Sequence, residues 1–417
     1  MSALCVTAAS GACAGSEPRP PGRPTSPAPG GRTAAAPPPA SPAPTSRVPA
    51  LLRAMSLEEK VGQLFVPTIS GATPARGVSL VRKYHLGGVI YFPGNMRSPR
   101  QTAALSNALQ RAAMASGPGV PLLISTDEEQ GIVSRVPFIT RFPSNRALAA
   151  TRDPEADVRT AARVTGEELR ALGINQNFAP VADVNIDPRN PVIGVRSFGT
   201  DPGRVARLVG VAVDAYRAAG VAATAKHFPG HGDTDTDSHT GLPVIDHTKA
   251  RWQRLDAPPF KTAIAHGIDA IMTAHIVVPR LDPSRHPATM SSPVLTGLLR
   301  DELGFDGVVI TDSLQMAGAR KKYGPVRAAV RALEAGADQL LMPVSLPKAY
   351  RAVLAAVRDG SIPRDRIDQA VSRVLRMKER RGLFAAPYVD TAAAAKVVGS
   401  REHKAAARRV AAHVHGS

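Results

Sequence analysis

Cysteine is nearly absent from this chain of 417 residues. The two cysteines, Cys5 and Cys13, both lie within the first thirteen residues. A disulfide framework or a thiolate zinc site needs several cysteines inside the folded part of a protein. Residues 14–417 contain none, so neither kind of site can form there.

Aromatic side chains are also scarce, at 4% of the residues. Proteins that bind single-stranded nucleic acid stack the bases on aromatic rings. We therefore expect no nucleic acid partner. The chain also lacks, after its start, any apolar run of 18 or more residues, which excludes a membrane-spanning helix there.

Acidic residues are outnumbered. The chain has 34 Asp and Glu against 52 Lys and Arg, which gives a formal charge of +18. Such a charge suits an anionic partner, for example a lipid surface or a cell-wall polymer. The alternative is that the arginines are scattered, solvated side chains, because no block of five or six like charges occurs outside the basic C-terminal end.

The first 49 residues show two compositional features. "MSALCVTAASGACAGS" is weakly apolar, and its "SGAC" resembles a lipoprotein cleavage box ending at Cys13. A stretch rich in Pro, Ala, Gly and Ser follows, and such a stretch cannot form a packed core. We expect a truncated signal, a lipid anchor and a disordered tether, on an exported and membrane-anchored or cell-surface protein. A cytoplasmic enzyme with a disordered tail is the alternative, because no positive n-region precedes the apolar part.

From residue 50 onward, short apolar runs alternate with helical patterns. Continuous apolar runs are typical of parallel strands that are covered on both faces. Eight such runs separated by helices predict a (β/α)8 TIM barrel, an α/β fold, as a single catalytic domain over residues 50–384. An open doubly wound sheet is disfavoured because no glycine-rich phosphate turn follows the first run. Residues 385–417 are expected to be a basic tail. The predicted strands are 61–69, 86–93, 120–129, 174–184, 221–228, 268–278, 307–313 and 337–345, and clear helical patterns cover 101–116, 155–173 and 202–220.

Titratable residues stand at the ends of these apolar runs. In a TIM barrel the functional groups collect at the carboxyl ends of the strands. Charged groups that meet at one mouth are difficult to explain as core, so they indicate an active site. These residues are Asp127, Asp183, Lys226, His227, His275 and Asp312.

The segment "KHFPGHGDTDTDSH" (226–239) has three histidines and three aspartates. A calcium loop is disfavoured because Ser238 and Val244 replace the required Gly and Glu. A zinc site lacks the HExxH arrangement, and a merely polar loop would not need so many titratable groups. Acid/base chemistry fits best, since Asp237 lies two residues before His239 and can polarise its ring. Asp312 is then a candidate nucleophile.

Five ordered motifs resemble glycoside hydrolase family 3, in particular its NagZ-type bacterial β-N-acetylglucosaminidases. The resemblance covers about residues 50–384. The motifs are "MSLEEKVGQLF" (55–65), "PLLISTDEEQGIVSRV" (121–136), "NFAPVADVNIDPRNPVIGVRSFG" (177–199), "KHFPGHGDTDTDSH" and "GFDGVVITDSLQMAGA" (304–319).

The resemblance implies a retaining β-N-acetylhexosaminidase that needs no cofactor or metal, with Asp312 as nucleophile and His239, assisted by Asp237, as acid/base. It implies a terminal β-GlcNAc residue on a saccharide or muropeptide as substrate, peptidoglycan turnover as the setting, and a monomer. Residues that would hold the sugar are Asp127, Arg135, Arg196, Lys226 and His227. Phosphorolysis is a close alternative, because a histidine acid/base tolerates an attacking phosphate anion. A non-catalytic cell-wall-binding protein is the more distant one.

One residue departs from the family pattern. The family has D-x-E-G-G-x-V-x-R at the third strand, whereas this chain has "DEEQGIVSR", with Gln130 in place of the first glycine. A glycine there permits φ > 0 or a close approach of the sugar. We expect Gln130 to affect the rim of the pocket and the substrate preference rather than catalysis.

Overall fold

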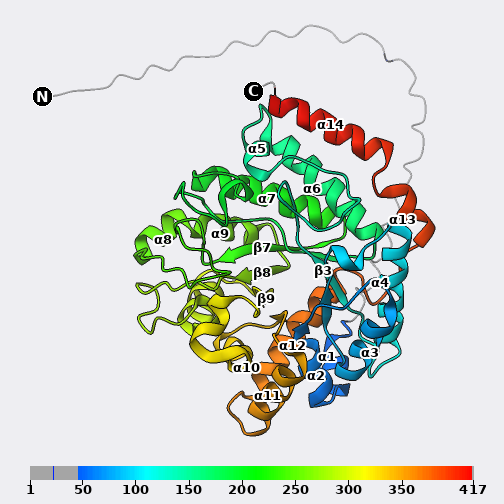
Figure 1. Cartoon of the computed structure of the whole chain (residues 1–417), viewed down its shortest axis with the longest axis vertical. Coiled ribbons are helices and arrows are strands. Elements are labelled where there is room, and N and C mark those ends of the chain that lie inside the picture. The colour runs from blue at the N-terminus through cyan, green and yellow to red at the C-terminus, as the bar shows by residue number, and fades with distance from the viewer. Residues whose placement is uncertain (1–21, 23–45, 416–417) are drawn as a thin grey trace, which may run out of the picture. The chain divides into compact units, whose positions relative to one another are not determined.

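The computed structural model describes Gly22 and residues 46–415 (Figure 1). The predicted signal and nearly all of the predicted tether lie outside the described residues. The described part starts with helices α1 (Val48–Ala54) and α2 (Leu57–Gln63). None of the helices described combines the length and the apolar character that crossing a bilayer requires.

Eight parallel strands form a closed ring. Six of them pair in the order β2-β3-β6-β7-β8-β9, and β1 pairs with β10. Parallel bridges Thr68–Ile90 and Ile310–Gln339 join the pair to both edges of the six-stranded sheet. The predicted (β/α)8 barrel is therefore confirmed. Its strands are β1 (Phe65–Val66), β2 (Gly88–Ile90), β3 (Leu123–Thr126), β6 (Gln176–Asn177), β7 (Ala222–Phe228), β8 (Ala270–Thr273), β9 (Val308–Thr311) and β10 (Leu340–Leu341).

Every strand lies inside one of the eight predicted runs, but the first run was predicted too long. Residues 61–63 belong to α2, which a Ser56–Glu59 capping box starts. Most of the helices outside the ring have proline in the first turn, and several have an Asp or Ser N-cap, as at Asp153 and Asp201. These helices are α3 (Pro74–Tyr84), α4 (Pro99–Met114), α5 (Asn145–Ala149), α6 (Pro154–Ala171), α7 (Pro202–Ala218), α8 (Lys249–Leu255), α9 (Ala257–Ala265), the π-helix η4 (Pro293–Glu302), α10 (Ala317–Ala335), α11 (Leu346–Arg358) and α12 (Arg364–Arg380).

Short elements complete the loops that follow the strands. A two-stranded antiparallel hairpin comes directly after β3, and single 3-10 turns occur in three other loops. The hairpin consists of β4 (Glu128–Gln130) and β5 (Val133–Ser134), and the turns are η1 (Pro93–Asn95), η2 (Gly194–Arg196) and η3 (Ala288–Met290).

The interior of the barrel is apolar and closed at one end. An inner layer contains Phe178 and Met272 among its buried side chains. At the amino ends of the strands, Leu123 and Val308 pack against Met377 of α12. That end therefore serves stability, and it leaves the carboxyl ends of the strands for a site.

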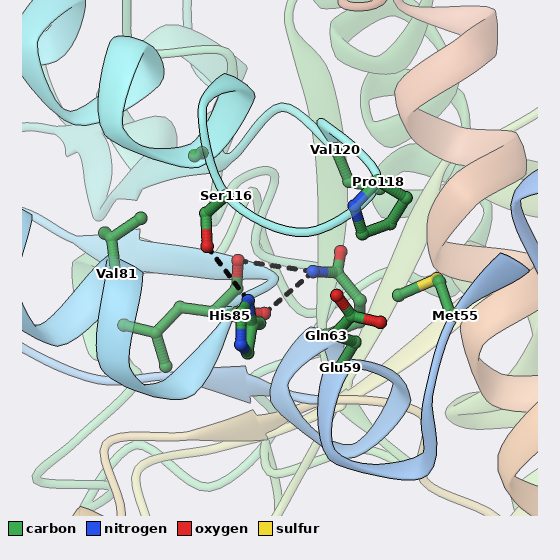
Figure 2. A pocket seen from close by; sticks show the side chains of 10 residues that line it. Met55, Glu59, Gln63, Val81, His85, Ser116, Pro118 and Val120 are labelled. Carbon is green, nitrogen blue, oxygen red and sulfur yellow. Dashed lines mark hydrogen bonds between the residues drawn. The ribbon is translucent and has the colours of Figure 1, made fainter.

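Polar contacts fasten the loops at the closed end (Figure 2). Gln63 donates a hydrogen bond from Nε2 to the carbonyl of His85 at 2.8 Å, and the His85 ring meets Ser116 Oγ at 3.0 Å. Lys378 is fully buried, and its Nζ donates to Gln63 Oε1 at 2.6 Å. The side chains around this small pocket come from segments that precede β1, β2 and β3, so it lies away from the carboxyl ends of the strands.

The segment predicted as a basic tail forms two helices instead. They are α13 (Thr391–Val397) and α14 (Arg401–His415). Helix α13 contacts α4 and α6, and α14 lies beside α5 and α6 (Figure 1). The buried side chains of α14 recur at helical spacing, at His403, Ala406, Ala407 and Val410, so one face of the helix packs on the barrel.

Candidate active site

A pocket of about 550 Å³ opens beyond the carboxyl ends of the strands. Its volume is in the usual range for small-molecule sites. All eight residues that the sequence predicted for the site line this one pocket: Asp127, Arg135, Arg196, Lys226, His227, Asp237, His239 and Asp312.

Asp312 directly follows β9 and is partly accessible from the pocket. Its backbone N–H donates to Thr273 O, and its Oδ1 accepts the Ser313 N–H at 2.7 Å. Burial raises the pKa of the Asp312 carboxyl, but the imidazoles of His227 and His275 and the Ser313 N–H lower it more, so that the pKa lies below its ordinary value. Asp312 is therefore a fixed anion at neutral pH, as a carboxylate nucleophile must be.

His239 is held by Asp237 within the loop after β7. The His239 ring Nδ1 lies 2.8 Å from Asp237 Oδ1, which also accepts the His239 backbone N–H at 2.7 Å. Burial raises the pKa of Asp237, while these two hydrogen bonds lower it below its ordinary value. With Nδ1–H donating to this carboxylate, Nε2 is left to exchange a proton with a ligand.

This loop is docked at three further points. Ser238 Oγ lies 3.0 Å from His231 Nε2, and the backbone N–H groups of Ala317 and Gly318 donate to the His239 and Ser238 carbonyls at 3.3 Å. His231 is buried, and burial lowers its pKa to about 4. It is therefore neutral at pH 7 and can hydrogen-bond Ser238 without adding charge.

Four charged side chains of the pocket form one network. Lys226 Nζ lies 2.7 Å from both Asp127 Oδ1 and Glu129 Oε1. Arg196 contacts both oxygens of Glu129 at 2.8 Å. Burial raises the pKa of Glu129, but Lys226 and Arg196 lower it far below its ordinary value. The network presents cationic donors and the Asp127 carboxylate to the pocket, a set that suits sugar hydroxyls.

Glu129 was not predicted as a site residue, and Asp183 was predicted at the mouth of the barrel but without a role in the site. Asp183 is fully buried, and its Oδ2 lies 2.7 Å from His227 Nδ1 while its Oδ1 accepts the His231 N–H at 2.8 Å. This pair fixes which nitrogen of His227 faces the pocket.

Gln130 adopts the conformation expected of a glycine but does not reach the pocket. Its φ is 68°, in the left-handed region. Its buried side chain turns away from the pocket, donating to Thr140 O and Thr165 Oγ1 and accepting the Phe142 N–H. The Gln130 side chain itself therefore does not form the pocket rim.

Arg135, which follows the hairpin, has its guanidinium 5.8 Å from the Phe92 ring centroid.

The three histidines of the segment 226–239 have separate partners. His227 pairs with Asp183, His231 with Ser238 and His239 with Asp237. Within residues 46–415, no group of three or more His, Cys, Asp or Glu side chains is arranged to hold a metal ion.

Comparisons with known proteins agree on one family. The family model described as "Glycosyl hydrolase family 3 N terminal domain" matches residues 56–377. "Beta-hexosaminidase A" of Pseudoalteromonas piscicida is 41% identical over 325 residues, which is 72% of this chain and 54% of the relative.

Two solved structures are similar over most of the chain. A family 3 β-N-acetylglucosaminidase from Paenibacillus sp. superposes with a TM-score of 0.83 at 46% identity, covering 87% of this chain and 69% of the other. The β-glucoside phosphorylase BglX superposes with a TM-score of 0.81 at 27% identity, covering 87% and 66%. The chain spans about half the length of the Pseudoalteromonas relative and about two thirds of these two structures.

Proposed function

The chain belongs to glycosyl hydrolase family 3, and we propose that it is a retaining β-N-acetylglucosaminidase that removes terminal, non-reducing β-GlcNAc. The observation that carries this proposal is the meeting of the Asp312 carboxylate and the Asp237–His239 pair in one pocket. The names of the Pseudoalteromonas and Paenibacillus relatives, a beta-hexosaminidase and a β-N-acetylglucosaminidase, support the same sugar.

In the first half of the proposed reaction, Asp312 attacks the anomeric carbon. The bond to the leaving oxygen breaks, and His239 Nε2 gives that oxygen its proton. Asp237 stabilises the imidazolium before the transfer and keeps the ring oriented. The product of this half is a glycosyl ester on Asp312, and the aglycone departs.

In the second half, neutral His239 takes a proton from a water molecule, and the water oxygen attacks the anomeric carbon. The ester bond to Asp312 breaks, so the carboxylate and the imidazolium are both restored. Two displacements at one carbon retain the β configuration. A histidine in this role also avoids a second negative charge beside the nucleophile.

Sugar binding is assigned to this charged network and to His227. Asp127, Arg196, Lys226 and His227 offer both donors and an acceptor to the hydroxyls and the N-acetyl group. Glu129 holds Lys226 and Arg196 in place by close ion pairs. Because these groups are already fixed before the sugar arrives, they lose little side-chain entropy on binding.

Peptidoglycan fragments on the outside of the cell are the proposed source of substrate. The net charge of +18 suits an anionic wall. The lipoprotein-like start and the tether of residues 1–49 support an exported, lipid-anchored protein.

Asp312→Ala tests the proposal. We expect turnover of 4-nitrophenyl β-N-acetylglucosaminide to fall by about 10³-fold or more, because no covalent intermediate can form. The assay includes the β-glucoside and β-xyloside, with EDTA present, and thermal unfolding shows whether the variant is folded. Appreciable residual turnover by a folded variant would refute the nucleophile assignment.

Phosphorolysis is the second candidate, favoured by the similarity to a β-glucoside phosphorylase. In that reaction phosphate replaces water in the second half, and the histidine acid/base adds no negative charge to repel the anion. Product analysis with and without phosphate separates the two candidates. Formation of GlcNAc-1-phosphate as the main product would overturn simple hydrolysis.

A further inference from the structure

We propose that the C-terminal helix α14 is a positioning element of the active site and that His403 is its positioning residue. The proposal rests on the proposed function, because its role is to hold the sugar-binding hairpin β4–β5. Both α13 and α14 lie beyond residue 377, where the match to the family model ends.

Glu168 of α6 is a fully buried carboxylate at the centre of this contact. Four donors surround it. Thr140 contributes its backbone N–H at 2.8 Å and its Oγ1 at 2.6 Å, Gly399 contributes its N–H at 3.0 Å, and His403 contributes Nδ1 at 2.8 Å. A buried carboxylate must be fully hydrogen-bonded. Two of its four donors come from the C-terminal segment.

Thr140 connects Glu168 to Gln130 of the hairpin β4–β5 through hydrogen bonds. Its carbonyl accepts Gln130 Nε2 at 3.2 Å, and the neighbouring Phe142 N–H donates to Gln130 Oε1 at 3.0 Å. Gln130, Thr140 and Glu168 are all at most 5% exposed, so water cannot easily replace these hydrogen bonds.

Gln130 is the last residue of β4 and follows Glu129 directly. Glu129 holds Lys226 and Arg196 on the sugar-binding wall. The other side of the hairpin leads to Arg135, whose backbone N–H is held by Glu128. A shift of the hairpin therefore displaces pocket side chains from the hairpin itself, from β7 and from η2.

His403 is suited to this role because both ring nitrogens meet carboxylates. Nδ1 contacts Glu168, and Nε2 lies 3.1 Å from Glu167 on the same helix. The contact thus ties α14 to α6 at one point. His413, ten residues further along α14, makes a separate pair with Asp157 at 3.0 Å. That pair is near the start of α6 and has no link to Thr140.

The test compares His403→Leu with His413→Leu. Loss of the Glu168 contact should weaken ground-state and transition-state binding of the sugar equally, so KM for the 4-nitrophenyl substrate rises about tenfold while kcat stays nearly constant. His413→Leu should leave KM unchanged. His403→Asn, whose amide can donate from the position of Nδ1, should restore most of the wild-type KM.

A second variant and a second readout keep the test decisive. Thr140→Val removes a donor to Glu168 from the barrel side and should raise KM in the same way, even where His403→Leu fails to fold. Hydrogen exchange of residues 131–136 needs no substrate, and it should become faster in His403→Leu and Thr140→Val but not in His413→Leu.

Failure of the positioning role and failure of the proposed function give different results. An unchanged KM and unchanged exchange in folded His403→Leu would overturn the positioning role, and so would equal effects of His403→Leu and His413→Leu. Absence of β-glycoside turnover in the wild-type protein would instead contradict the proposed function, and hydrogen exchange would still decide whether α14 holds the hairpin.

Discussion

His239 exposes 61% of its side chain, although it is assigned the proton transfer in a pocket whose nucleophile is much more enclosed. The exposed position of His239 suits proton transfer. An imidazole in contact with water can exchange its proton between the two halves of the reaction, whereas Asp312 must stay ionised within a fixed hydrogen-bond frame.

His239→Ala should depend on the leaving group. Removal of a general acid costs about 10²–10⁴-fold in kcat/KM where the leaving oxygen needs a proton. We expect that loss for an alkyl β-N-acetylglucosaminide and a much smaller one for the 4-nitrophenyl glycoside. Steady-state kinetics with both substrates measure the difference.

His266→Ala is the matched control for this variant. His266 pairs with Asp214 at 2.8 Å, in the same way as His239 with Asp237, but it does not line the pocket. It should leave both substrates unaffected. An equal loss on both substrates in His239→Ala would count against an acid role.

For single residues, the sequence identified the side chains that line the pocket but not the ion pairs that hold them. Asp127 was found because it ends an apolar run. Glu129 lies two residues further on an extended segment, so it faces the same side as Asp127, and this spacing was a usable signal. The partners of Glu129, in contrast, come from β7 and η2, and only the folded barrel brings them together.

The loop that carries His239 is clamped at its start by His247. The ring of His247 is buried between two carboxylates, with Nε2 2.6 Å from Asp233 and Nδ1 2.7 Å from Asp256. Burial lowers the pKa of His247, but the bonds to Asp256 and Asp233 raise it above its ordinary value. The stabilisation is therefore complete below the unfolded pKa of histidine and is lost as the pH rises through the folded pKa.

His247→Leu should leave Asp233 and Asp256 without their shared cation. We expect a loss of about 3 kcal/mol in the free energy of unfolding, because a buried pair loses one partner. We also expect kcat to fall about tenfold as the acid/base loop loosens. Thermal or urea unfolding and steady-state kinetics measure the two effects.

Asp246→Asn, next in the sequence, provides the control. It breaks only the exposed Arg280–Asp246 pair, so its effect should stay within about 0.5 kcal/mol. Should His247→Leu behave like Asp246→Asn, the clamp would have no part in holding the loop.

The secondary structure of the C-terminal segment was not predicted, because that segment has few large apolar side chains. The eight strands were found because aliphatic runs are long and regular. The sequence of residues 385–417 predicts a basic tail rather than helices, because the face that packs consists mostly of alanine and histidine and the outer face is basic. The spacing of His403, Ala406, Ala407 and Val410 was the available signal. The donor role of His403 towards Glu168 needs the fold.

For the molecule as a whole, Lys378 at the closed end of the barrel imposes a pH dependence on stability. Burial lowers the pKa of Lys378 well below its ordinary value, and within residues 46–415 its Nζ hydrogen-bonds only the neutral amide of Gln63. The unfolded chain then binds a proton that the folded protein does not. Stability must rise with pH up to the ordinary pKa of lysine, because unfolding takes up a proton in that range.

Lys378→Met should remove this dependence. The free energy of unfolding of the variant relative to wild type should be highest at the low end of the pH range and should decline by up to about 1.4 kcal/mol per pH unit as the pH rises towards the ordinary pKa of lysine. Urea unfolding at several pH values measures the slope. The exposed Lys348→Met should show no such slope, and parallel pH profiles of Lys378→Met and wild type would contradict the prediction.

The pairing of β1 with β10 has a consequence for the making of the protein. Phe65 pairs with Leu340, so the ring cannot close until almost the whole barrel has left the ribosome. Until then two apolar strand edges stay open, at β1 and at β9. Such edges recruit other chains, and non-local pairings form slowly. The nascent chain therefore passes through a long period in which chaperones, rather than its own contacts, have to keep it from aggregating.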